Sequence, residues 1–210
     1  MEFVKWSSIP RLSKEKMRIT EKIDGTNSAI RIRPTSAADD TTGALSTIAV
    51  SDDIMYNVWV QSRNRFITPG KSTDNAGFAG WVWDNLDELV SILGPGDHYG
   101  EWWGSGIQRG YGLTKGEKRF SLFNAERWFE LLHPTEDKFD LGLYTVPLLY
   151  TGQYDGAKIQ ELKQDLIDNG SKAAPGYKSE GLIVELKEIG AKYKVLCEND
   201  DIHKWELKSA

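Results

Sequence analysis

The chain has 210 residues, a formal net charge of −5 and one cysteine, Cys197. A single cysteine excludes an internal disulfide and favours a reducing cytoplasm as the compartment. The acidic balance argues against a nonspecific nucleic-acid binder, which usually has a basic surface. No apolar run reaches the roughly 18 residues of a membrane span, and residues 1–10 lack the pattern of a secretory signal. We therefore expect no membrane partner, and the length predicts a single domain over residues 1–210.

Alternating apolar and polar residues predict strands, and apolar residues three and four apart predict helices. Strands are expected at residues 28–33, 48–50, 55–61, 98–103, 119–123, 143–150, 181–186 and 191–196, with Pro147 interrupting the sixth. Helices are expected at residues 78–93, 125–133 and 157–168, the first with Asp74 or Asn75 at its start. Strands and helices do not alternate regularly, so the pattern predicts an α+β fold with mostly antiparallel sheet.

The most informative segment is residues 21–27, in which Lys22, Asp24 and Gly25 form a Lys-x-Asp-Gly pattern. This pattern is typical of a lysine that bonds covalently to a nucleotide. Lysine attacks the α-phosphorus of a nucleoside triphosphate only as a neutral amine. A reference pKa of about 10.4 leaves about one lysine in a thousand neutral at pH 7.4. Such a site needs nearby cations, which favour loss of the proton, and carboxylates that hold a metal ion. A turn with a solvated lysine is the alternative interpretation.

Two carboxylates stand at predicted apolar strands. Glu101 lies inside one strand, and Glu180 directly precedes the strand that begins at Gly181. Glutamate is rarely buried without a partner, and magnesium prefers oxygen ligands. We therefore expect Glu101 to face a ribose hydroxyl or a metal-bound water, and Glu180 to hold magnesium at the start of its strand. The alternatives are a solvated edge residue for Glu101 and a polar strand start for Glu180.

Cations and one aromatic ring complete the candidate site. Lys192 and Lys194 fall on one face of a strand, where they can clamp triphosphate oxygens and lower the pKa of a third lysine. A solvent-facing strand would give the same pattern. Phe123 ends a strand and can stack on a purine or pack in the core. Asn27 and Arg63 can position a phosphate or a terminal hydroxyl, or be a turn amide and a solvated arginine.

In this order, the segments resemble the ATP-dependent RNA ligases of the covalent nucleotidyltransferase superfamily, above all the phage-type ligases that seal nicks in duplex RNA. Residues 21–27 match the first motif, and the trailing Thr26-Asn27 is typical of RNA ligases rather than DNA ligases. The other matching segments are Gly100-Glu101 with an extension to Gly112, the strand ending at Phe123, Glu180-Gly181 and Lys192-Tyr193-Lys194. Asn124 departs from the family, which usually has an aspartate there.

The resemblance implies two mostly antiparallel sheets flanked by helices, with the nucleotide between the sheets. It implies Lys22 as the adenylated nucleophile, with Asp24, Glu101, Glu180, Lys192 and Lys194 as the other catalytic residues and Glu101 and Glu180 at the metal. Nucleotide binding is implied for Glu21, Lys22, Asn27, Arg63, Glu101, Phe123, Glu180, Lys192 and Lys194. Phe123 would stack on adenine, and Asn27 and Arg63 would serve nick sealing rather than adenylation of the lysine.

The implied activity is that of an enzyme, an ATP-dependent RNA ligase with ATP and Mg²⁺ or Mn²⁺ as cofactors. Its partner would be RNA with 5′-phosphate and 3′-hydroxyl ends in a nicked duplex. The alternatives are a DNA ligase, a GTP-dependent capping guanylyltransferase, and a non-catalytic nucleotide- or RNA-binding module. We expect no separate C-terminal domain after the last motif, so a second protein that supplies nucleic-acid binding is a further candidate partner. A phage protein in the host cytoplasm fits the resemblance.

Overall fold

The computed structural model describes residues 2–6, 8–9, 11–35, 42–50 and 54–200, without the side chains of residues 47–50. Two compact units make up the chain. The first unit combines Met1–Lys22 with Pro147–Ala210, and the second is the continuous segment Ile23–Val146. No described helix is long and apolar enough to cross a membrane. Each unit is built on its own sheet, so the α+β fold with mostly antiparallel strands is confirmed.

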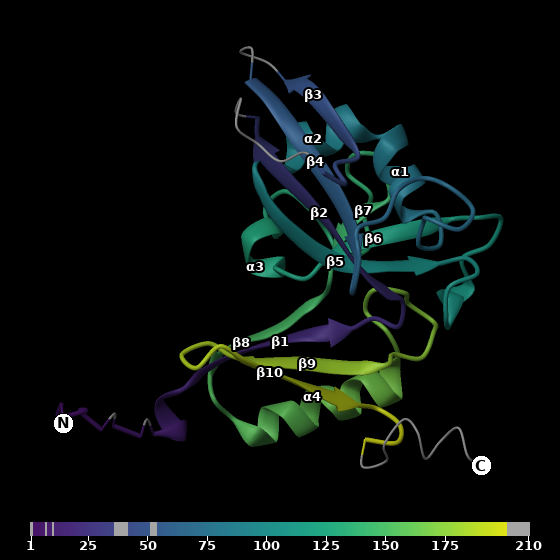
Figure 1. The fold of residues 1–210 in the computed structure, drawn as a ribbon. Helices are drawn as coiled ribbons and strands as arrows, with labels where there is room; N and C mark the ends of the chain where they lie inside the picture. The colour runs from purple at the N-terminus through teal and green to yellow at the C-terminus, as the bar shows by residue number, and fades with distance from the viewer. Residues whose placement is uncertain (1, 7, 10, 36–41, 51–53, 201–210) are drawn as a thin grey trace. The chain divides into compact units, whose positions relative to one another are not determined.

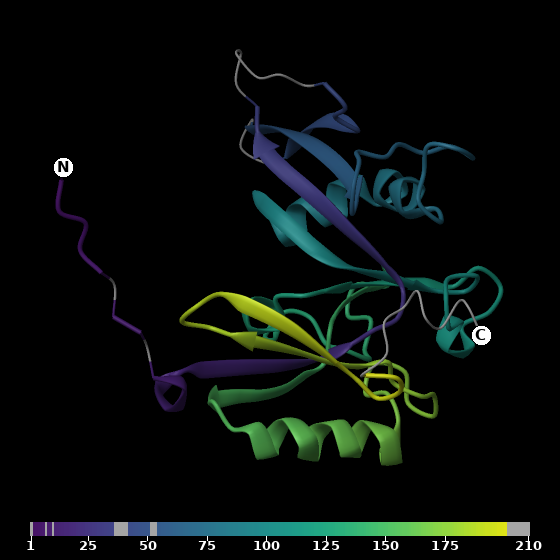
Figure 2. The same ribbon diagram turned by 60° about the horizontal axis from the view of Figure 1, so that its bottom comes forward.

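The first unit contains a four-stranded antiparallel sheet in the order β10-β9-β1-β8. Its strands are β1 (Lys16–Lys22), β8 (Leu148–Gln153), β9 (Gly181–Leu186) and β10 (Ala191–Leu196), and the short helix η1 (Leu12–Lys14) precedes β1. Helix α4 (Gly156–Asn169) lies along one face of this sheet (Figures 1 and 2). Met17, Ile19 and Leu182 on that face pack with Leu166 of α4, so this face is the core of the unit.

The second unit contains a six-stranded sheet in the order β3-β4-β2-β5-β6-β7. Its strands are β2 (Thr26–Pro34), β3 (Ser46–Val50), β4 (Ile54–Ser62), β5 (Gly96–Gly104), β6 (Lys118–Leu122) and β7 (Leu143–Thr145). Only β6 and β7 pair in parallel among these described strands. The helical segments are α1 (Phe78–Asp84), α2 (Leu86–Leu93), η2 (Gly110–Gly112) and α3 (Ala125–Trp128).

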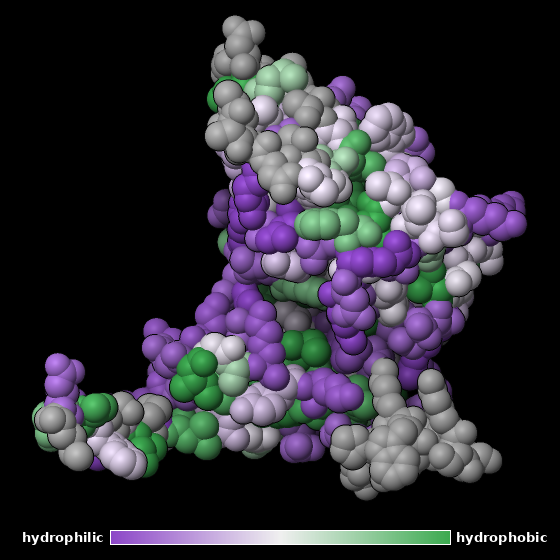
Figure 3. Space-filling model, viewed as in Figure 1, coloured by the Kyte–Doolittle hydropathy of each residue, from purple (hydrophilic) through white to green (hydrophobic). Residues whose placement is uncertain are grey.

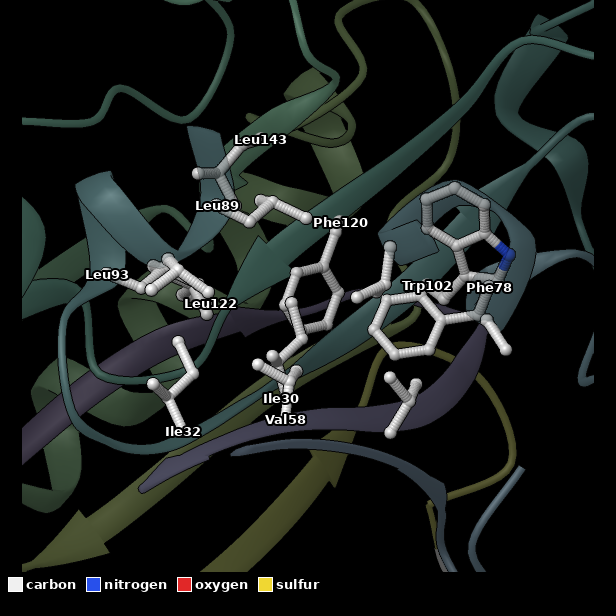
Figure 4. Close-up of a cluster of buried hydrophobic side chains, with 14 of the residues drawn as sticks. Ile30, Ile32, Val58, Phe78, Leu89, Leu93, Trp102, Phe120, Leu122 and Leu143 are labelled. Carbon is white, nitrogen blue, oxygen red and sulfur yellow. The ribbon is translucent and has the colours of Figure 1, made fainter. Parts of the chain in front are cut away.

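Helices α1 and α2 cover one face of the six-stranded sheet and enclose its core (Figures 1 and 4). The Phe78 ring lies 5.4 Å from Trp102 and 4.8 Å from Phe120, measured between ring centroids. Apolar side chains of β2, β4 and β6, such as Ile30 and Val58, pack around these rings. The other face of the sheet carries the alternate residues of each strand, among them the buried Glu101 and Trp103.

Three predicted elements differ from the structure. The helix expected at residues 78–93 breaks at Asn85, whose φ of −122° and ψ of 29° are not helical. The helix expected at residues 125–133 ends at Trp128. The strand expected at residues 143–150 is interrupted at Pro147, because proline has no N–H to donate to a neighbouring strand. Its two parts, β7 and β8, belong to different sheets.

Two other details of the fold concern element starts. Asp74 accepts hydrogen bonds from the N–H groups of Ala79 and Gly80, so this carboxylate stabilises the start of α1 as predicted. Strand β1, in contrast, was not predicted, although it carries Lys22.

Candidate functional site

Lys22 and Glu180 form the centre of the candidate site in the first unit. Lys22 ends β1 and lies opposite Gly181, the first residue of β9. Its Nζ lies 2.5 Å from Oε2 of Glu180, and the two side chains are only 24% and 11% exposed. The predicted nucleophile and one predicted metal ligand are therefore in direct contact. An ammonium in such a pair has no lone pair, so the contact describes a resting state.

The sheet face around Lys22 carries an excess of positive charge. Strand pairing puts Arg18 opposite Glu185 and Glu185 opposite Lys192, while Lys194 lies two residues further along β10. Because alternate residues share a face, Arg18, Lys22, Lys192 and Lys194 all lie on the side of the sheet away from α4. Glu185 is ion-paired with Arg18 and lies 3.7 Å from Lys192. With Glu180, this gives four cations and two carboxylates, a charge balance that suits a triphosphate.

Arg18 and Glu185 are residues that the sequence reasoning missed. Arg18 has a signal in the sequence, since Arg18, Thr20 and Lys22 are spaced two residues apart. That signal requires strand β1 to be recognised first. Glu185 also changes the interpretation of Lys192, whose charge is partly offset by a carboxylate, whereas Lys194 lies opposite the apolar Ile183.

Glu21, the neighbour of Lys22, lies on the opposite face of the sheet and is 1% exposed. Its Oε2 accepts hydrogen bonds from the N–H groups of Lys172 and Ala173, at 2.8 and 3.0 Å, and its Oε1 accepts one from the Ser179 hydroxyl at 2.8 Å. The carboxylate thus holds the segment that leads to Glu180. A nucleotide contact of Glu21 stays a prediction, and these three bonds give its side chain a structural role.

In the second unit, Glu101 of β5, Asn27 of β2 and Arg63, the residue after β4, form one hydrogen-bonded chain. Glu101 is 6% exposed, and its Oε2 accepts a hydrogen bond from Nδ2 of Asn27 at 2.7 Å. Oδ1 of Asn27 in turn accepts two bonds from Arg63, from Nε at 3.0 Å and Nη2 at 2.6 Å. The structure therefore joins three of the predicted residues, and Glu101 orients the Asn27 amide.

The turn after Lys22 is fixed by residues of the second unit. The Asp24 N–H donates to the Tyr111 hydroxyl at 2.9 Å, and the Asp24 carboxylate pairs with Nε of Arg109 at 3.2 Å. The Gly25 N–H donates to Oε1 of Glu101 at 3.1 Å. A Cβ at Gly25 would lie 2.5 Å from the Trp102 carbonyl oxygen, so the motif glycine is required by close packing. Arg109 was not predicted as part of the site.

Close packing also explains Gly181. The backbone of the neighbouring strand β10 approaches this residue so closely that a Cβ at Gly181 would collide with the Val195 backbone carbonyl. Gly181 also has a φ of +152°, a conformation that favours glycine.

Phe123 follows β6 on the sheet face that carries Glu101. Ser121 lies opposite Glu101, Phe123 comes two residues later, and the Phe123 N–H donates to the Tyr99 carbonyl at 2.9 Å. The ring is half-buried and therefore partly accessible.

The carboxylates of Glu101 and Glu180 suit a metal ion that is coordinated mainly by a bound substrate and by water. Among the described residues, no group of three or more His, Cys, Asp or Glu side chains is arranged around a shared metal position. Glu101 already accepts bonds from Gly25 and Asn27, whereas Glu180 contacts Lys22. Magnesium is commonly bound by one or two carboxylates together with substrate phosphates and water. Glu180 is therefore the better suited of the two.

Comparisons with known proteins show the family of the chain and its fold. The model of the RNA ligase family matches residues 15–205. Solved structures of Naegleria gruberi RNA ligase have the same fold. A lysine-to-alanine mutant with ATP and Mn has a TM-score of 0.55 and 17% identity over 88% of this chain and 50% of that chain. A glutamate-to-alanine mutant with AMP and Mn has a TM-score of 0.54 and 19% identity over 95% and 53%.

The same ligase with PPi has a TM-score of 0.54 and 17% identity over 88% of this chain and 50% of that chain. The chain thus spans about half the length of the solved structures that it matches. No curated protein matches the sequence.

Proposed function

The chain belongs to the RNA ligase family, and we propose that it is an ATP-dependent RNA ligase that works through a covalent lysyl-AMP intermediate on Lys22. The observation that carries this proposal is the position of Lys22. It ends a strand, contacts Glu180 at 2.5 Å and shares a sheet face with Arg18, Lys192 and Lys194. A structural lysine would need no such surplus of cations around it.

In the first step, Nζ of Lys22 attacks the α-phosphorus of ATP, a P–N bond forms, and the bond to the β-phosphate breaks. The ion pair with Glu180 must separate beforehand, because only a neutral amine is a nucleophile. Arg18, Lys192 and Lys194 offset the negative charge that gathers on the departing pyrophosphate. A magnesium or manganese ion bound by Glu180, with Glu101 as the second expected ligand, would polarise the phosphate oxygens.

In the second step, AMP passes from Lys22 to the 5′-phosphate of an RNA end. The 3′-hydroxyl of the neighbouring end then attacks that phosphate, the new phosphodiester forms, and AMP leaves. Arg63 and Asn27 suit this stage, because a guanidinium can bind a phosphate through two N–H groups. Their link to Glu101 would keep the amide oriented while RNA binds. The RNA in this proposal is a nicked duplex.

Labelling with α-³²P-ATP and magnesium tests the central step. The protein is expected to retain label through denaturing electrophoresis and to release it in acid, because a P–N bond is acid-labile. Lys22→Ala should abolish the label, whereas Lys158→Ala, an exposed lysine on α4, should retain it. Label that survives Lys22→Ala, or that never forms on the wild-type protein, would overturn the proposal.

Substrate comparisons test the remaining parts of the proposal. ATP should label the protein and GTP should not, since labelling by GTP alone would indicate a capping enzyme. A nick in duplex RNA should be sealed faster than the same nick in DNA. Faster sealing of DNA would overturn the assignment to RNA while leaving the lysyl-AMP step intact.

A further inference from the structure

Outside the residues discussed above, the second unit presents a face that has no part in forming lysyl-AMP. We propose that the face of β2 and β5 around Arg31, Arg33 and Tyr99 binds the backbone of the RNA strand beyond the nucleotides that are joined. The inference rests on the proposed function only in taking RNA as the substrate, and RNA binding can be measured whether or not Lys22 is adenylated.

This face continues along β2 from the hydrogen-bonded group of Arg63, Asn27 and Glu101. Strand pairing gives successive rows on the side away from α1 and α2, with Ala29 between Gln61 and Tyr99, and then Arg31 between Trp59 and Asp97. Four residues of β2 separate Asn27 from Arg31, which corresponds to about 13 Å. A nucleotide at Asn27 would therefore leave the Arg31 row open for a later part of the same strand.

The arginines on this face retain donors for a ligand. Arg31 donates to Asp97 from Nε at 3.0 Å and Nη2 at 3.3 Å, and to Gln61 from Nη1 at 3.5 Å. Arg33 donates to Asp97 from Nη2 at 2.5 Å and to the Ile32 carbonyl at 3.0 Å. Each guanidinium has five N–H donors. The contacts above use five of these ten donors, so among the described residues the other five remain for a ligand. Asp97 balances only one of the two positive charges.

Exposure and charge favour a nucleic-acid strand as the occupant. The side chains of Arg31 and Arg33 are 34% and 44% exposed, and Tyr99 is 48% exposed in the next row. Figure 3 shows hydrophilic side chains gathered over β2 and β5 on this side. The whole chain has a net charge of −5, so the positive charge of this surface is a local feature and does not follow from the overall composition. Arginine beside an accessible aromatic ring is the combination that binds phosphates and stacks on a base where the RNA strand runs single-stranded beyond the duplex around the nick.

Fluorescence anisotropy with labelled single-stranded RNA, measured over a range of salt concentrations, tests the proposal. Arg31→Ala with Arg33→Ala should weaken binding by at least about tenfold, and should lower the salt slope by about 1.4 because each phosphate contact contributes about 0.7. Tyr99→Leu should weaken binding by about fivefold or more. Asp97→Asn should strengthen binding, because it removes the only carboxylate between the two arginines in the described structure.

The control is Arg11→Ala with Arg127→Ala, which removes the same charge from two exposed positions elsewhere. Equal weakening by both double variants, or unchanged binding with Asp97→Asn, would overturn the proposal. If loss of both arginines unfolds the protein, Asp97→Asn and Tyr99→Leu carry the test alone. A change of oligomeric mass in sedimentation with unchanged RNA affinity would make the face an interface between copies and overturn the proposal. Self-adenylation should match wild type in all variants, which separates this test from that of the proposed function.

Discussion

Glu21 and Lys22 are neighbours in sequence, face opposite sides of one sheet, and are each bound to one of two neighbouring residues near the other end of the chain. Glu21 accepts a hydrogen bond from Ser179 at 2.8 Å, and Lys22 contacts Glu180 at 2.5 Å. The buried carboxylate of Glu21 therefore holds the segment that carries Glu180, the partner of the Lys22 amine. The structural contact of Glu21 and the contact of Lys22 in the candidate site therefore depend on two adjacent residues, Ser179 and Glu180.

Replacing Glu21 tests this coupling. Glu21→Ala leaves two backbone N–H groups and a hydroxyl without their acceptor, so we expect a loss of at least about 2 kcal/mol in the free energy of unfolding. Urea denaturation with an unchanged m-value measures it. Glu161→Gln, at an exposed position on α4, should change stability by less than about 0.5 kcal/mol. Wild-type stability of Glu21→Ala would contradict the role assigned to this carboxylate.

Glu180→Gln keeps the size of the side chain but removes its charge. We expect self-adenylation to slow by about a hundredfold or more, because the metal ion that Glu180 is proposed to hold offsets the developing negative charge on the phosphate. The magnesium concentration that gives half-maximal labelling should rise, since an amide is a poorer metal ligand. Both quantities come from one titration of the labelling rate with metal. An unchanged rate and metal dependence would remove Glu180 from the site.

Gly25→Ala tests the packing explanation of the motif glycine. The new Cβ would lie 2.5 Å from the Trp102 carbonyl and 2.8 Å from Cβ of Trp103, so strand β5 or the turn has to move. We expect a loss of about 1–3 kcal/mol of stability, as for overpacking in a core, together with loss of labelling. Gly156→Ala is the matched control, because its nearest contact would be 3.6 Å from the new atom. Equal stability of the two variants would show that the turn adapts.

His98 predicts a pH dependence of stability. Burial lowers the pKa of His98 below its usual value, and the charge of Arg127 acts in the same direction. In the window between this lowered pKa and the unfolded value of about 6.5, the unfolded chain binds more protons, so stability falls as pH falls. Urea midpoints at pH 7.5 and 5.5 should differ less in His98→Gln than in wild type. An equal difference would assign the slope to other groups.

The motifs were easier to recognise in the sequence than the strand that carries the nucleophile. Residues 181–186 are strongly apolar, residues 191–196 alternate in part, and both are strands with the predicted bounds. Strand β1 escaped prediction because Met17 and Ile19 alternate with charged and polar residues over only seven positions. Pro147 was recognised as an interruption, but a local pattern carries no information on which sheet each half joins.

Side-chain contacts were predictable only where strand register determines them. Placing Lys192 and Lys194 on one face follows from alternation alone. The pairing of Arg18 with Glu185, and the hold of Glu21 on Ser179, join residues more than 150 positions apart in the sequence. Such contacts depend on the order of strands in the sheet. Gly181 illustrates the same limit, since its close neighbour is the backbone of β10.

The first unit combines an early and a late segment of the chain, and this affects the order in which its contacts form during translation. The second unit is one continuous segment, Ile23–Val146, whereas Lys22 meets Glu180 only after β8 and β9 have left the ribosome. Contacts between such distant segments form late, because a long loop has to close first. A nascent chain that has not yet reached β10 therefore presents Lys22 with Arg18 but without Lys192 and Lys194, and the candidate site is complete only after β10 has been made.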